Sequence, residues 1–125
     1  MKKLAIPIAF SLMLGASQAW AHADHLKPQF GGITAEADVF QVELVTKGNQ
    51  IILYLSEHGA PVESAGASGK LLLLTGKNKE EAVLTPSGYQ ALSAKLKTKP
   101  ARGSKVVASI NVPGREAGTV RFTLK

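Results

Sequence analysis

Residues 40–55 read FQVELVTKGNQIILYL, and this stretch decides the fold. Residues 40–45 alternate between apolar side chains and mostly polar ones, the period of two that is typical of a half-buried strand. Residues 47–50 (KGNQ) are a turn sequence. Residues 51–55 again place every second apolar side chain on one face. The stretch therefore predicts two strands joined by a short turn.

The same pattern of short strands and turns continues to the end of the chain. Residues 71–74 are all leucine, which indicates a strand that is buried on both sides or central in its sheet. Residues 105–112 and 120–124 alternate again. Seven or eight short strands, separated by Gly, Pro and Asn turns, are typical of a sandwich or barrel. We expect an all-β fold, an antiparallel Greek-key β-sandwich of immunoglobulin-like or fibronectin-like type; a small closed barrel is the alternative.

The first 21 residues have the three-part layout of a bacterial secretory signal peptide. Lys2 and Lys3 precede the apolar run Leu4–Gly15, and residues 19–21 (AWA) place small side chains at a cleavage site. The apolar run is shorter than the about 20 residues that span a bilayer. We therefore expect residues 1–21 to be cleaved, and we expect a periplasmic protein with no membrane span after cleavage.

Cleavage would leave two parts. Residues 22–32 are a polar arm, and residues 33–125 have the strand pattern of a single β-sandwich domain. A cut after Ala21 makes His22 the first residue. Because residues 21–23 (AHA) are also a small-x-small signal, a cut after Ala23 is the alternative, and it would remove His22.

The chain that follows the signal peptide contains no sulfur. The sequence has no cysteine, and Met1 and Met13 both belong to the signal peptide. A metal site must therefore use nitrogen and oxygen donors. Such donors suit Cu(II), Zn(II), Ni(II) or Co(II) better than Cu(I).

Charge gives a weaker indication of partners. The formal net charge is +6, and Lys2 and Lys3 leave with the signal peptide. The remaining basic residues are scattered, with the densest group in residues 95–105. We interpret this group as a solvated loop and strand edge, with docking to an acidic partner as the alternative. We expect no nucleic-acid partner, because an exported protein meets little nucleic acid.

The three histidines are the candidate metal ligands. His22 and His25 lie in the arm on either side of Asp24, and His58 follows Glu57 at a predicted strand end. As the first residue, His22 would offer its amino group and imidazole as a chelate. His25 would add a second imidazole, and His58 with Glu57 would close the site from the sheet. For each histidine the alternative is a solvent-exposed side chain without a functional role.

No sequence motif indicates an enzyme. The chain has no Gly-x-Ser-x-Gly elbow, no phosphate loop and no His-Glu-x-x-His helix. Glu80 and Glu81 are adjacent, so on a strand their side chains point to opposite faces and cannot share a proton. We expect a protein without catalytic residues.

Several segments together resemble a known group of proteins: His25 ahead of Gly31–Gly32, then Phe40–Val45, Leu53–Val62, Gly66–Lys70, Leu84–Gly88, Lys105–Val107 and Val120–Phe122. With these segments the chain resembles small periplasmic proteins associated with heavy-metal efflux systems. It is also similar to the β-rich segments of the periplasmic adaptor subunits of those pumps. The resemblance implies His25 and His58 as metal ligands and efflux-pump components as partners. A mature start at histidine is similar to periplasmic copper-resistance β-sandwich proteins.

Two functions follow from these observations. The first is a periplasmic metal-binding accessory protein of heavy-metal resistance or efflux, which binds Cu(II) or another divalent cation through His22, His25, His58 and Glu57. The second is a structural or interaction module that docks on an envelope protein complex without a metal, since sandwich folds host many binding roles.

Overall fold

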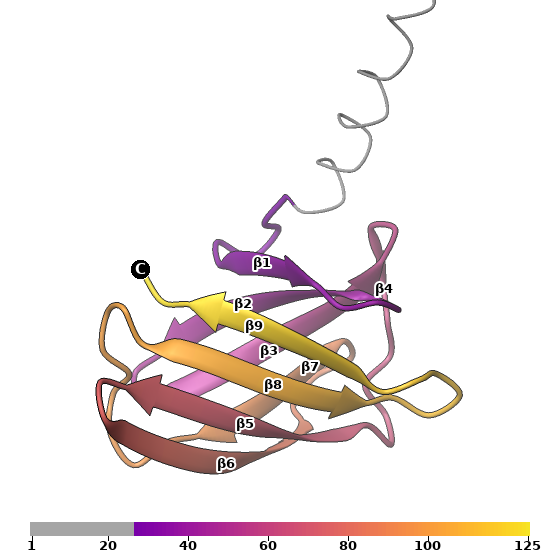
Figure 1. Cartoon of the computed structure of the whole chain (residues 1–125). Helices are drawn as coiled ribbons and strands as arrows, with labels where there is room; N and C mark the ends of the chain where they lie inside the picture. Colours follow the sequence, from indigo (N-terminus) through magenta and orange to yellow (C-terminus); the bar gives the residue numbers. More distant parts are fainter. Residues whose placement is uncertain (1–26) are drawn as a thin grey trace, which may run out of the picture.

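Antiparallel strands make up most of residues 27–125, the part of the chain that the computed structural model describes (Figure 1). The nine strands are β1 (Ile33–Glu36), β2 (Gln41–Lys47), β3 (Gln50–Glu57), β4 (Ala60–Pro61), β5 (Ser68–Thr75), β6 (Asn78–Pro86), β7 (Ala91–Lys95), β8 (Lys105–Asn111) and β9 (Gly118–Thr123). The prediction of an antiparallel all-β fold is confirmed. The strand count exceeds seven or eight because Ala60 and Pro61 form an additional short strand, β4, which pairs back onto the end of β3.

The stretch of residues 40–55 makes up most of the β2–β3 hairpin. Its register pairs Leu44 with Leu53 and Val42 with Leu55, and all four side chains are buried. Lys47 pairs with Gln50 at the turn. Alternation along both strands therefore turns their apolar sides to the core, as the sequence predicts.

The strands form one strongly curved sheet in the order β1-β2-β3-β7-β6-β5-β8-β9, with β4 attached to β3. We call β1, β2, β3 and β7 the first layer and β6, β5, β8 and β9 the second layer. β6 joins the layers, because it pairs along most of its length with β5 while Thr85 and Pro86 pair with β7.

The curvature brings the two ends of the sheet together in a nearly barrel-shaped arrangement (Figure 1). At the start of β9, a Cβ added to Gly118 would lie 3.0 Å from the Cβ of Ala37 and 3.1 Å from the ring of Phe40. Glycine thus allows β9 to pack closely against the loop between β1 and β2. The finer prediction of an immunoglobulin-like or fibronectin-like Greek-key sandwich is not confirmed.

The core lies between the two layers. It includes Phe40, Leu53 and Ile110, none of which is exposed. Full burial of such a side chain contributes about 1.5–3 kcal/mol. The leucine run behaves as a central strand, since β5 pairs with both β6 and β8. Its inward leucines are buried, whereas Leu72 and Leu74 face outward and are half-buried.

Candidate functional site

His58 lies in the tight turn between β3 and β4. Glu57 pairs with Ala60, so His58 and Gly59 form a two-residue loop. Their φ angles are 51° and 85°, the signs that a type I′ turn requires. His58 is the one non-glycine residue with positive φ in residues 27–125, and histidine tolerates this region better than most residues do. The turn holds the exposed His58 at the end of a rigid hairpin.

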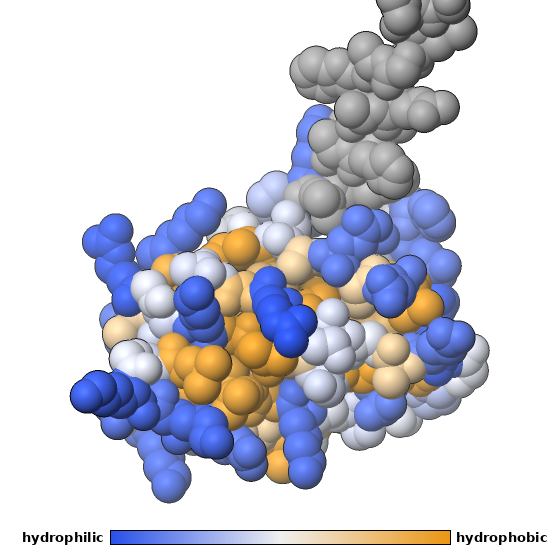
Figure 2. All heavy atoms as spheres, viewed as in Figure 1, coloured by the Kyte–Doolittle hydropathy of each residue, from blue (hydrophilic) through white to orange (hydrophobic). Residues whose placement is uncertain are grey.

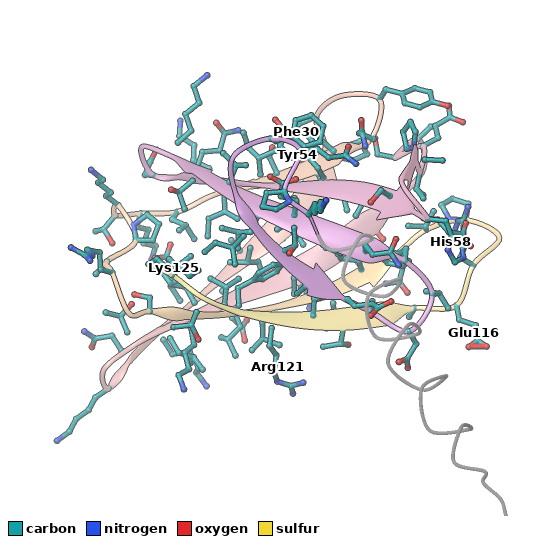
Figure 3. The ribbon with its side chains drawn as sticks, turned by 90° about the horizontal axis from the view of Figure 1, so that it is seen from above. Phe30, Tyr54, His58, Glu116, Arg121 and Lys125 are labelled. Carbon is teal, nitrogen blue, oxygen red and sulfur yellow. The ribbon has the colours of Figure 1, made fainter. Side chains whose placement is uncertain are left out.

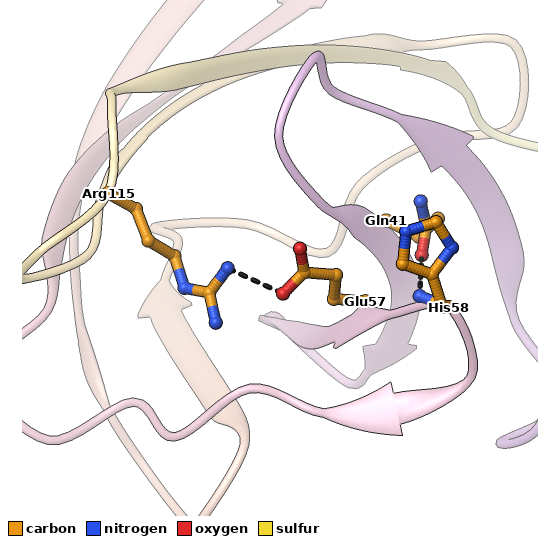
Figure 4. A network of polar contacts seen from close by, with 4 residues as sticks. All are labelled: Gln41, Glu57, His58 and Arg115. Carbon is orange, nitrogen blue, oxygen red and sulfur yellow. Dashed lines mark hydrogen bonds and ion pairs between the residues drawn. The ribbon is translucent and has the colours of Figure 1, made fainter.

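The backbone of His58 is also tied to the first layer. Its N–H donates to Oε1 of Gln41, at 3.0 Å (Figure 4). Gln41 is almost fully buried, and its Nε2 donates to Oε2 of Glu36 at 3.4 Å. The turn therefore has a fixed position relative to β1 and β2.

Glu57 points away from His58, toward the loop that follows β8 (Figure 4). Its Oε1 accepts a hydrogen bond from Nη1 of Arg115 at 2.7 Å, and both side chains are partly exposed. Exposed ion pairs of this kind stabilise a fold by about 0–1 kcal/mol. A metal ion bound by Glu57 would have to displace Arg115 from this carboxylate.

The residues around His58 line an open hollow of about 320 Å³, here called the His58 hollow. Its members are Glu36, Asp38, Val39, Gln41, Glu57, His58, Arg115 and Glu116. Figure 3 shows His58 and Glu116 at the same end of the molecule. The hollow combines one imidazole with oxygen donors, a ligand set that suits borderline divalent ions.

The end of the polar arm is anchored on the outer face of the first layer, and Glu43 holds it there. One carboxylate oxygen of Glu43 accepts the backbone N–H of Gln29 at 2.7 Å; the other accepts those of Phe30 at 2.8 Å and Gly32 at 2.7 Å. Glu43 is buried. Because hydrogen bonds to a charged group are among the stronger ones, this carboxylate fixes residues 29–32 on β2.

An aromatic contact strengthens the same attachment. The ring of Phe30 stacks on that of Tyr54 in β3, with centroids 3.9 Å apart and planes 10° from parallel (Figure 3). Tyr54 pairs with Glu43 across the β2–β3 ladder. The side-chain stack and the carboxylate therefore hold neighbouring residues of the arm at one place.

The anchored arm and the His58 hollow adjoin at Gln41. Gln41 lines the His58 hollow and also a small hollow to which Lys27 and Phe30 contribute. Lys27 is the first residue that the structure describes. Lys27 therefore lies near Gln41, whose side chain accepts a hydrogen bond from the backbone N–H of His58.

The structure places two of the four predicted metal ligands. His58 and Glu57 lie next to each other at the end of β3, with side chains that point in different directions (Figure 4). His22 and His25 lie outside the described residues. Within residues 27–125, no group of three or more His, Cys, Asp or Glu side chains is arranged to hold a metal ion.

Sequence reasoning missed the residues that organise this region. Gln41 and Glu43 look like solvent-facing residues of an alternating strand, and the structure buries both. Arg115 is far from Glu57 in sequence and gave no signal. A buried polar pair on the outer face of a strand depends on what covers that face, which a local pattern does not contain.

The chain matches no family model, and neither curated proteins nor solved structures include a match to it. The described residues also contain no helix that is long and apolar enough to cross a bilayer.

Proposed function

We propose that this protein is a periplasmic metal-binding accessory protein of heavy-metal efflux or resistance. In this proposal Cu(II) or another divalent ion, Zn(II), Ni(II) or Co(II), is held between the polar arm and the His58 end of the β-domain. His25 and His58 supply imidazoles, and the carboxylates of the His58 hollow are available to complete the ligand set. With a cut after Ala21, His22 would add its terminal chelate.

One observation carries the proposal: the anchored end of the arm and the His58 hollow share one lining residue, Gln41. His25 lies two residues before Lys27. At the limit of about 3.6 Å per extended residue, its Cα is within about 7 Å of the Cα of Lys27. Lys27 and His58 have Gln41 as a common neighbour, since Lys27 shares one hollow with it and His58 another. The anchor at Glu43 would thus reduce the conformational entropy that is lost when His25 and His58 bind one ion.

The donor chemistry also supports the proposal. Imidazole nitrogen and carboxylate oxygen suit Cu(II) and Zn(II), and cysteine is absent from the sequence. A shared site of this kind would bind and release an ion with movement of the arm alone. That behaviour fits an accessory protein that buffers a metal or hands it to pump components.

Cu(II) titration of the exported protein tests the proposal, followed by calorimetry or by the visible absorption of the copper site. We expect a site of micromolar affinity or tighter, weakened at least tenfold by His25→Ala and by His58→Asn. Asparagine is chosen because it tolerates the positive φ of this turn. Glu81→Gln, a neutralised carboxylate on an exposed position of β6, is the matched control and should leave affinity unchanged.

Two further measurements separate the parts of the proposal. Mass spectrometry of the exported protein identifies its first residue, and a start at Asp24 would remove the His22 chelate but leave the His25–His58 pair. A protein that binds none of the four ions at micromolar concentration would contradict the proposal. Such a protein would instead fit the alternative, a module that docks on an envelope complex without a metal.

A further inference from the structure

The second layer presents a distinctive outer face. Leu71 and Leu73 of β5 are buried in the core, so Lys70, Leu72 and Leu74 face outward by alternation. An apolar pair at outward-facing, half-buried positions of a central strand is unusual, because outward positions of an antiparallel sheet are normally polar.

Cross-strand pairing extends this face. Leu72 pairs with Val107 of β8, and Val107 pairs with Arg121 of β9. Leu74 pairs with Lys105. The apolar centre, which consists of Leu72, Leu74 and Val107, therefore has cations beside it on β5, β8 and β9. We call these three residues with Lys70, Lys105 and Arg121 the β5–β8 face.

The apolar centre is visible at the surface. Figure 2 shows hydrophobic side chains gathered over β5 and β8, with strongly hydrophilic ones around and across them. An open hollow of about 420 Å³ on this face is lined by Leu74 and Val107 together with Lys105 and Arg121. Val83 of neighbouring β6 is 64% exposed and adds to the apolar area.

The cations of this face have no anionic partner within residues 27–125. Lys70, Lys105 and Arg121 are exposed, and none of them takes part in an ion pair with another described residue. Lys79 of β6, also exposed, adds a fourth cation, and Glu81 is the one carboxylate of β6 that faces the same side. The face is therefore positive as well as apolar.

Charge distinguishes two candidate partners of this face, a second copy of the chain and an anionic membrane. A second copy docked through the same face would bring two sets of Lys70, Lys105 and Arg121 into one interface, with one carboxylate, Glu81, from each copy. Such an excess of like charge opposes association. An anionic phospholipid surface meets both features, because apolar side chains enter the interface while long basic side chains reach the phosphates. The cations surround the apolar centre on three strands, which fits a diffuse planar charge better than a single acidic side chain.

We infer that the β5–β8 face docks on the surface of anionic phospholipid membranes. Phe30 and Tyr54 lie on the side of the molecule opposite Arg121 (Figure 3). Docking through the β5–β8 face therefore leaves Phe30 and Tyr54 on the side away from the lipid. The inference rests on this face alone and does not depend on a metal ion.

Sedimentation with vesicles tests the inference. The exported protein is mixed with vesicles of phosphatidylcholine containing about one-third phosphatidylglycerol, and with vesicles of phosphatidylcholine alone. We expect binding to the anionic vesicles only, and its loss at high salt because lysine and arginine attraction to a charged surface is screened. Lys105→Gln with Arg121→Gln should weaken binding at least tenfold, and Val107→Ser should weaken it with all charges retained.

A matched control has the same change in net charge on the other layer. Lys47→Gln with Lys95→Gln alters two exposed lysines that both pair with Gln50 on the first layer, and it should change binding less than twofold. Circular dichroism checks that each variant is folded. Absence of binding to the anionic vesicles at low salt would overturn the inference, as would equal losses in the face variant and the control. Binding that none of the variants alters would overturn it too.

Discussion

The conformation of one residue, His58, links the turn to the proposed metal site. A non-glycine residue with positive φ normally costs about 1–2 kcal/mol. The two-residue loop between β3 and β4 imposes this conformation on His58, whose φ is 51°. The backbone strain depends on the φ of residue 58, whereas the proposed metal binding depends on its imidazole. Substitutions at this position can therefore test strain and metal binding separately.

The free energy of unfolding of His58 variants should depend on how well the new residue tolerates positive φ. We expect His58→Asn to unfold in urea within about 0.5 kcal/mol of the wild type, since asparagine adopts this region readily. His58→Gly should be more stable than the wild type by up to about 1 kcal/mol, because glycine has no steric cost at positive φ and its entropic cost is smaller than the strain that it relieves. His58→Val should lose about 1–2 kcal/mol, because a β-branched side chain is poorly accommodated there. Equal stability of all three variants would contradict the described turn.

At the scale of elements, one carboxylate accepts the backbone hydrogen bonds that anchor the end of the arm. Glu43 accepts N–H groups from Gln29, Phe30 and Gly32, and all three distances are 2.8 Å or less. The arm covers polar residues of β2 that would otherwise face solvent. Glu43 thus converts an exposed position of a strand into the attachment point of a loop.

Removal of this carboxylate should release the arm. Glu43→Ala leaves three N–H groups without their acceptor, and we expect a loss of about 1–3 kcal/mol in the free energy of unfolding. Hydrogen exchange at residues 29–32 should become faster, while exchange in β8 and β9 stays slow. Glu81→Ala on β6 is the control and should change neither quantity. Unchanged exchange at residues 29–32 in Glu43→Ala would show that other contacts hold the arm.

The two ends of the molecule differ in the charged side chains that line their hollows. Glu36, Asp38, Glu57 and Glu116 line the His58 hollow at one end. Lys97, Lys99, Arg102 and Lys125 lie at the opposite end, around two open hollows of about 520 and 450 Å³ that flank the loop between β7 and β8. Figure 3 shows His58 and Lys125 at these two ends. The four carboxylates outnumber the one cation of the His58 hollow, Arg115, so the electrostatic field at this end would favour the proposed binding of a cation.

Closure of the sheet is the feature on which the whole fold depends, and Phe40 tests it. Phe40 is fully buried and meets Gly118 of β9 at the place where the sheet ends approach. We expect Phe40→Ala to lose about 3–5 kcal/mol, measured by thermal or urea unfolding. Phe30→Ala, the same substitution at a residue that is 42% exposed, is the matched control and should lose clearly less. Similar losses would contradict closure around Phe40.

The sequence by itself determined the strands. Alternation in residues 40–45 and 51–55 predicted β2 and β3. The apolar run of residues 71–74 predicted a strand that is buried on both sides or central, and β5 is central but only half-buried on its outer face. These properties are local, because a side chain's face in a strand follows from its position parity. Similarly, the sequence predicted that His58 and Glu57 end a strand.

Only the tertiary structure decided how the strands join and which polar residues are buried. Pairing of β3 with β7 and of β5 with β8 brings together segments far apart in sequence, and strand patterns alone do not select among such pairings. Long-range neighbours determine the burial of Glu43, the ion pair of Glu57 with Arg115 and the partial exposure of Leu72. The reason is physical: parity fixes the face of a side chain, whereas long-range contacts determine what covers that face.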